Sequence, residues 1–199
     1  MNLPQFLILF RLILAPVIIL LAYFMEEKAS ILIVILMFAG LFSDIFDGII
    51  ARKLNLSTEK LRRQDSQTDL IFWLSMGFAT WMIRRDILSD KLLFIFILIG
   101  MEALCYLISF IKFKKETCTH AMLSKFWGIT LIIAFTSLLS FNHAGFPFYL
   151  TLLIGFLAHI DVILIIFLLP NWQHDIPSFY HALEIRRGKP IKRHKLFNG

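Results

Sequence analysis

The chain contains 199 residues, of which 58% are hydrophobic and only 17% are charged, and its mean hydropathy is +0.76. Soluble domains contain roughly 45–50% apolar and 25% charged residues, so this composition argues against a soluble enzyme and predicts an integral membrane protein. The net charge of +6 does not indicate nucleic-acid binding, because most basic residues lie between apolar stretches. The two cysteines, Cys105 and Cys118, form neither a disulfide pattern nor a paired metal motif.

Six stretches approach the length of about 20 apolar residues that a helix needs to cross a bilayer. We therefore expect an all-α bundle of six transmembrane helices. The third stretch reaches that length only if it extends back through Asp65, which places carboxylates at its start. The predicted spans are Phe6 to Met25, Ala29 to Ala51, Leu70 to Ile83, Leu92 to Ile111, Met122 to Phe141 and Pro147 to Leu169.

The basic residues predict how these spans are oriented. Of the 20 Lys and Arg residues, 15 lie in the loops after the second and fourth spans and in the C-terminal tail. An excess of Lys and Arg marks the cytoplasmic side, so both termini are expected in the cytoplasm. Residues 1–170 then form a six-span domain, and residues 171–199 form a basic cytoplasmic tail that includes aromatic residues suited to the bilayer surface.

Four aspartates lie at positions where ionisable residues are costly. Asp44 and Asp47 are three residues apart within an apolar stretch, and Asp65 and Asp69 are four apart, so each pair shares one helix face. If the second and third spans are antiparallel, the four carboxylates converge near the cytoplasmic end of the bundle. Two divalent cations about 4 Å apart would relieve their repulsion, an arrangement that recurs in phosphoryl transfer.

Small and basic residues follow the first pair of acids. Gly48 and Ala51 lie on the same helix face as Asp44 and leave room for a ligand, while the Arg52 guanidinium suits a phosphate. A purely structural interpretation pairs the first two aspartates with Arg11 or Lys125 and assigns the small residues to helix packing. That interpretation does not require four acids at one membrane depth.

The pattern Asp44-x2-Asp47-Gly48-x2-Ala51-Arg52, followed by Asp65-x3-Asp69, resembles the signature of the CDP-alcohol phosphatidyltransferases. The N-terminal stretch with Asn2 and Arg11 resembles the phosphatidylglycerophosphate synthase branch of that family. Four positions depart from the pattern. Leu61 stands where the family motif has a glycine, and Gln5, Ile8 and Leu70 stand where that branch often has asparagine, threonine and lysine.

The resemblance implies transfer of a phosphatidyl group from CDP-diacylglycerol to a small alcohol acceptor, with release of CMP and dependence on two divalent ions, Mg²⁺ or Mn²⁺. It implies that Asp44, Asp47, Asp65 and Asp69 hold metal and that Asp69 is the general base. It assigns CDP binding to the motif's small and basic residues, which are Gly48, Ala51 and Arg52.

Glycerol 3-phosphate is the expected acceptor, and its phosphate would need cationic partners. The candidates are Lys125, Arg62, Arg63 and Arg11. The resemblance also implies a homodimer in the lipid bilayer, and we expect the bacterial inner membrane with the active site on its cytoplasmic side. Two alternatives stay open: a small cation or proton transporter, which would also use intramembrane acids, and a degenerate family member that binds lipid without turnover.

Overall fold

The computed structural model describes residues 2–54, 56 and 58–189. Its elements are helical, and the described residues contain no strand, which confirms the all-α fold class. The long helices are α1 (Leu3–Met25), α2 (Ser30–Lys53), α3 (Glu59–Ile83), α5 (Leu92–Phe113), α6 (Met122–Phe141) and α7 (Phe146–Leu168). Short elements are η1 (Glu26–Ala29), α4 (Arg85–Leu88), η2 (Ser89–Lys91) and α8 (Phe179–Arg186).

Each of the six predicted spans coincides with one long helix. The third helix does extend back past Asp65, since α3 begins at Glu59. Four helical stretches are long and apolar enough to cross a membrane: Leu3–Lys53, which joins α1, η1 and α2, and then Arg85–Phe113, Met122–Phe141 and Phe146–Leu168. The charged first half of α3 keeps that helix below the hydropathy of the others, so the count of six spans stays a prediction.

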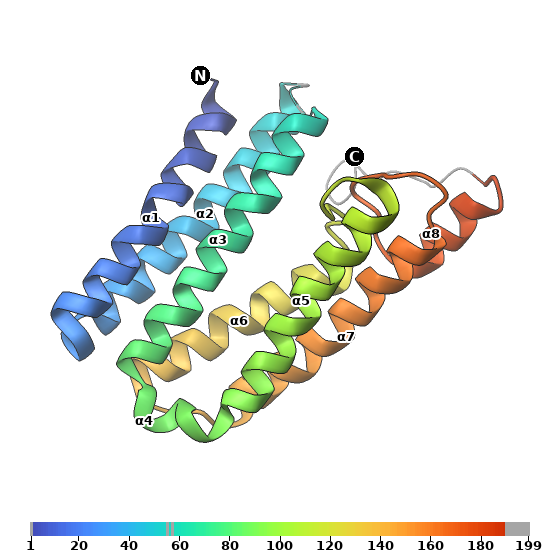
Figure 1. Cartoon of the computed structure of the whole chain (residues 1–199). Coiled ribbons are helices and arrows are strands. Elements are labelled where there is room, and N and C mark those ends of the chain that lie inside the picture. Colours follow the sequence, from blue (N-terminus) through green and yellow to red (C-terminus); the bar gives the residue numbers. More distant parts are fainter. Residues whose placement is uncertain (1, 55, 57, 190–199) are drawn as a thin grey trace. The chain divides into compact units, whose positions relative to one another are not determined.

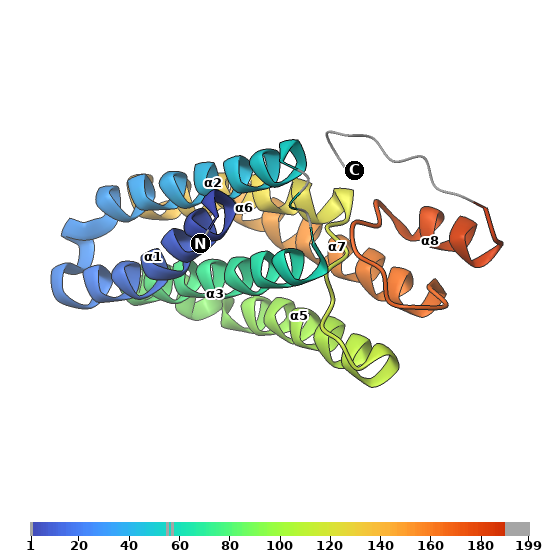
Figure 2. The ribbon, with the colours of Figure 1, turned by 90° about the horizontal axis from the view of Figure 1, so that it is seen from above.

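The chain forms two compact units. Unit 1 comprises residues 1–90 and 132–147, and unit 2 comprises residues 91–131 and 148–199. In unit 1, α1 packs against both α2 and α3, and Figures 1 and 2 show these three helices side by side. Gly40 permits the close approach of α2 to α3, because a side chain at this position would clash with the Phe72 ring.

Polar groups fix the ends of the helices in unit 1. Asn2 caps α1 in a reciprocal pair with Gln5, in which each backbone N–H donates to the other side chain at 3.1 Å. At the other end of the unit, Arg84 donates to the carbonyls of Leu138 and Leu139 at 3.0 and 3.2 Å and pairs with Glu27 at 2.5 Å. This arginine therefore ties the end of α3 to α6 and to η1.

Unit 2 is held together by α5, α7 and the segment that ends in α8. The ammonium of Lys112 donates to three carbonyls at the end of α7, those of Ile166, Phe167 and Leu169, at 2.8–2.9 Å. Asp161 of α7 accepts the N–H of Phe179 at 2.9 Å and so satisfies the first turn of α8. Within residues 171–199, α8 includes the aromatic residues Phe179 and Tyr180, and Trp172 precedes this helix.

Candidate metal and phosphate site

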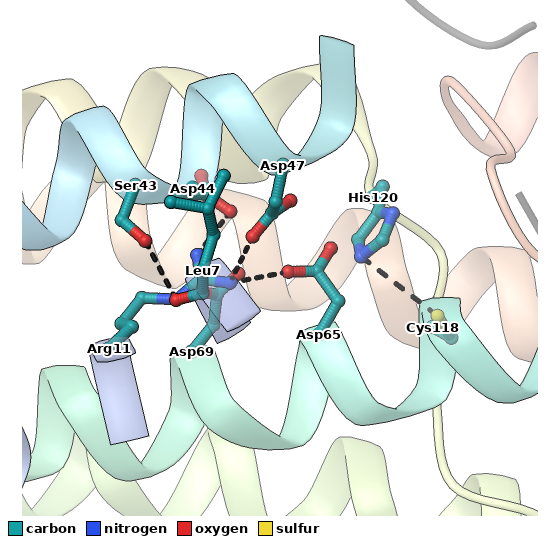
Figure 3. Close-up of polar contacts among 9 residues, drawn as sticks. All are labelled: Leu7, Arg11, Ser43, Asp44, Asp47, Asp65, Asp69, Cys118 and His120. Carbon is teal, nitrogen blue, oxygen red and sulfur yellow. Dashed lines mark hydrogen bonds and ion pairs between the residues drawn. The ribbon is translucent and has the colours of Figure 1, made fainter. Parts of the chain in front are cut away.

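Four carboxylates from two helices converge on one guanidinium in unit 1. Asp44 and Asp47 extend from α2, Asp65 and Asp69 extend from α3, and Arg11 enters from α1 (Figure 3). We call these five residues the aspartate cluster. The predicted convergence of the two aspartate pairs is therefore present in the structure.

The guanidinium of Arg11 bonds to all four acids. Its Nη2 lies 2.9 Å from Asp47 and 2.6 Å from Asp65, and its Nη1 lies 2.6 Å from Asp69 and also contacts Asp44. Arg11 is completely buried. The pairing with Arg11 that the structural interpretation expected is thus present, and it extends to both pairs of acids rather than to the first alone.

The charge of the cluster is far from balanced by Arg11. One guanidinium offsets one of four carboxylate charges, and like charges this close repel strongly in a low-dielectric setting. Ligand oxygens of Asp44, Asp47 and Asp65 all lie within 4.8 Å of one another, which is close enough to share a cation. An all-oxygen donor set with excess negative charge fits hard divalent ions such as Mg²⁺ or Mn²⁺.

The four acids differ in accessibility. The side chains of Asp47 and Asp65 are 4% and 9% exposed, whereas those of Asp44 and Asp69 are 39% and 30% exposed. Each helix therefore contributes one buried carboxylate that anchors the cluster and one carboxylate that a ligand can reach. Asp69 is on the reachable side, as a group that exchanges a proton with substrate must be.

The residues that follow the first acid pair lie beside the cluster on α2. A Cβ added at Gly48 would meet the Arg52 guanidinium at 3.5 Å, an ordinary contact, so the fold tolerates alanine there. Helix packing therefore does not explain this glycine. Ala51 is instead buried, in one apolar group with Ile8 and Leu61.

That apolar group contains two of the four departures from the family pattern. Leu61 and Ile8 are 6% and 7% exposed and lie together around Ala51. The side chain of Leu61, which is larger than the glycine of the family motif, therefore packs in one apolar group with Ile8. Leu61 leaves the four acids in place.

The basic candidates for acceptor binding lie in both units. Arg62 is buried and Arg63 half-buried in the first turns of α3, in the same unit as the aspartate cluster. Lys125 is exposed in the first turn of α6, within unit 2. The structure therefore brings Arg11 to the acids and leaves the acceptor assignments of these four residues as predictions.

Sequence reasoning missed a second polar group, in unit 2. Asp175 is bonded by His120 at 2.9 Å and by His174 at 2.7 Å. His120 also contacts the thiol of Cys118 at 3.9 Å, and Figure 3 shows this last contact. Burial alone would lower the pKa of His120, but the hydrogen bond with Asp175 outweighs it, and the pKa rises well above 6.5. The segments 118–120 and 174–175 are far apart in sequence, so no local pattern could have revealed this group.

The comparison with known families identifies the class of protein that carries this site. Residues 1–171 match the family described as CDP-alcohol phosphatidyltransferase. The chain belongs to this family, whose members depend on divalent metal, and its activity is that of a CDP-alcohol phosphatidyltransferase.

Several relatives of known name are similar to this chain. The chain is 29% identical to a CDP-diacylglycerol–glycerol-3-phosphate 3-phosphatidyltransferase of Wigglesworthia glossinidia brevipalpis, over 77% of this chain and 92% of the relative. It is 32% identical to a Rickettsia typhi protein of the same name, over 62% and 68%. A Bacillus subtilis CDP-diacylglycerol–serine O-phosphatidyltransferase is 36% identical over 42% and 46%. No solved structure matches the chain significantly.

Proposed function

We propose that the chain transfers the phosphatidyl group of CDP-diacylglycerol to a hydroxyl of glycerol 3-phosphate and releases CMP. The observation that carries this proposal is the convergence of four carboxylates from α2 and α3, next to Gly48 and Arg52, in a chain of this family. The relatives named for glycerol 3-phosphate match larger shares of this chain than the relative named for serine, which supports the acceptor.

In the proposed mechanism, Asp44, Asp47 and Asp65 hold two divalent ions, and Asp69 completes their ligand set. When bound, such ions supply Lewis-acid stabilisation of the negative charge on the pyrophosphate and on the departing CMP. Gly48 keeps the helix surface low where the cytidine diphosphate approaches, and Arg52 binds its phosphate. Ala51 supports this part of α2 from its buried position against Ile8 and Leu61. The acyl chains of the donor stay in the bilayer while its polar end reaches the aspartate cluster.

Asp69 is the proposed general base. Its carboxylate takes the proton of the acceptor hydroxyl, the acceptor oxygen attacks the phosphorus nearer the lipid, and the bond from that phosphorus to the CMP oxygen breaks. The phosphate of the acceptor requires cationic partners, for which we propose Arg11, Arg62 and Arg63 of unit 1. Lys125 of unit 2 is a separate candidate. Before ligands bind, the Arg11 guanidinium limits the repulsion among the acids and keeps them in place.

The remaining parts of the proposal concern topology and assembly. We place residues 1–170 in the bilayer as six spans formed by α1, α2, α3, α5, α6 and α7, each long enough at about 1.5 Å rise per residue. The basic loops favour cytoplasmic termini and a cytoplasmic active site, with residues 171–199 as a basic tail. The bacterial sources of the relatives favour the inner membrane. A homodimer in the bilayer completes the proposal.

The test is release of CMP from CDP-diacylglycerol by the purified protein in detergent. Mg²⁺ or Mn²⁺ is added, and the acceptors are glycerol 3-phosphate, serine, inositol, inositol phosphate, choline and water in parallel reactions. We expect release that depends on glycerol 3-phosphate and stops when EDTA removes the metal. Stimulation by serine alone would keep the reaction and correct the acceptor.

The same experiment separates the two alternatives. A degenerate member would bind CDP-diacylglycerol and release no CMP with any acceptor. A transporter would move cations across vesicles without the nucleotide, and it would need acids spread along a path through the membrane. The convergence of the four acids at one end of unit 1 favours the transferase.

A further inference from the structure

A groove of about 480 Å³ lies along unit 1 between the second half of α1 and the end of α3. Its walls are apolar, with Ile19 and Leu20 on α1 and Phe78 and Met82 on α3. Leu20 and Phe78 are 53% and 50% exposed, so the groove opens onto the surface of the unit. A volume of this size is typical of sites for small ligands.

One end of the groove carries the exposed guanidinium of Arg85. Trp81 lines the groove, and its indole N–H is buried without a hydrogen-bond partner among the described residues. The guanidinium of Arg85 lies 5.1 Å from the centre of the Trp81 ring. Within the part of the chain that the structure describes, no carboxylate lies within ion-pair distance of Arg85. An apolar groove that ends at such a guanidinium suits a ligand that combines an acyl chain with an anionic group.

This groove is separate from the aspartate cluster. Trp81 follows Asp69 by twelve residues on the same helix, which corresponds to about 18 Å at a rise of 1.5 Å per residue. Arg85 lies beyond the end of α3, farther still from the cluster. A phosphate bound at Arg85 is therefore not the phosphate that reacts at the aspartates.

We propose that the groove binds a glycerophospholipid of the bilayer that is neither donor nor product at the active site. Its acyl chain lies along Ile19, Leu20, Phe78 and Met82, and its phosphodiester oxygens accept from the guanidinium of Arg85. Charge complementarity selects this occupant, because a phosphodiester matches a guanidinium whereas an apolar helix of a second copy would not. Aromatic residues at the ends of spans commonly lie at headgroup level.

The test is quenching of tryptophan fluorescence by phosphatidylglycerol with brominated acyl chains, titrated into the full chain in detergent. We expect a saturable component in the parent that is absent from Trp81→Phe, since three tryptophans outside the groove remain in that variant. Arg85→Gln should raise the half-saturating lipid concentration about tenfold, the cost of losing one charge-assisted hydrogen bond. Lys28→Gln, at an exposed position in η1, is the matched control and should behave as the parent.

Three results would overturn the proposal. An equal half-saturating lipid concentration for Arg85→Gln and the parent would show that Arg85 does not bind the phosphate. Equal quenching by a brominated alkyl detergent without phosphate would reduce the groove to an ordinary lipid-facing surface. A dimer by light scattering in which the Trp81-dependent component is lost would assign the groove to a second copy. None of these readouts uses CMP release, so their failure leaves the proposed enzymatic function intact.

Discussion

The acids of the two units differ in the number and kind of groups that bond them. In unit 1, four aspartates from two helices bond the single guanidinium of Arg11. In unit 2, acids are matched locally: Glu102 bonds His159 at 2.7 Å, and Asp161 accepts the N–H of Phe179. Matched acids stabilise a fold, whereas an excess of acids remains available to cations from outside.

Burial alone does not identify a reactive carboxylate. Asp47 and Asp161 are 3% and 7% exposed, and each lies on a long apolar helix. They differ in the balance of charge around them. The expected effect of the same substitution therefore differs greatly between the two units.

Asn at these two positions provides the largest contrast. Asp47→Asn removes one anionic ligand, and because bound metal contributes several kcal/mol to phosphoryl transfer, we expect CMP release to fall about 10³-fold or more. Asp161→Asn keeps an oxygen that can accept the Phe179 N–H, so release should stay within about twofold. Isothermal titration with Mn²⁺ checks the cause, and a comparable loss of activity in both variants would contradict the comparison.

Asp69→Asn probes the proposed proton-transfer step, while the other three aspartates remain to hold metal. A general base contributes roughly 10²–10⁴-fold, so kcat should fall by that factor while the KM for CDP-diacylglycerol changes little. A titration with CDP-diacylglycerol under catalytically silent conditions measures donor binding independently. Unchanged turnover would remove Asp69 from the role of base and leave it as a metal ligand.

Arg11→Met tests whether the guanidinium offsets part of the negative charge of the four carboxylates in the absence of metal. Removing one partner of a buried ionic group typically costs about 3–5 kcal/mol, so the variant should unfold at a markedly lower temperature in EDTA. Added Mg²⁺ should restore more stability to this variant than to the parent. Thermal unfolding followed by intrinsic fluorescence measures both, and an equal metal response would show that the acids do not depend on Arg11.

Gly48→Ala should leave folding intact and weaken donor binding. The structure has room for the added methyl group against Arg52, so the unfolding temperature should match that of the parent. If the cytidine diphosphate approaches this helix face, overpacking should raise the KM for CDP-diacylglycerol by about ten- to a hundredfold. An unchanged KM would remove Gly48 from the donor site.

The sequence allowed prediction of the helices and the acids because both depend on local spacing. Apolar stretches defined all six long helices, and helical spacing put each aspartate pair on one face. Contacts between residues that are far apart in sequence could not be predicted from this local spacing. The reach of Arg11 to α3 and the packing of Leu61 against Ile8 depend on how three helices associate, which no spacing along one helix encodes.

The smallest predicted effect belongs to unit 2 and depends on pH. Because bonding to Asp175 raises the pKa of His120 above its unfolded value, the protonated pair stabilises the fold fully below about pH 6.5. This stabilisation is lost as the pH rises through the folded pKa. His120→Gln should therefore lower stability by about 1–3 kcal/mol at pH 5.5 and by less at pH 9.

The control for that measurement is His143→Gln, which changes an exposed histidine of unit 1. Unfolding temperatures of the parent and both variants at the two pH values isolate the contribution of His120, which shares Asp175 with His174. A penalty that is the same at both pH values would assign His120 a role in packing alone. A penalty confined to the acidic side, with CMP release by the folded protein unchanged, would assign the group formed by His120, His174 and Asp175 a role in stability rather than in the reaction.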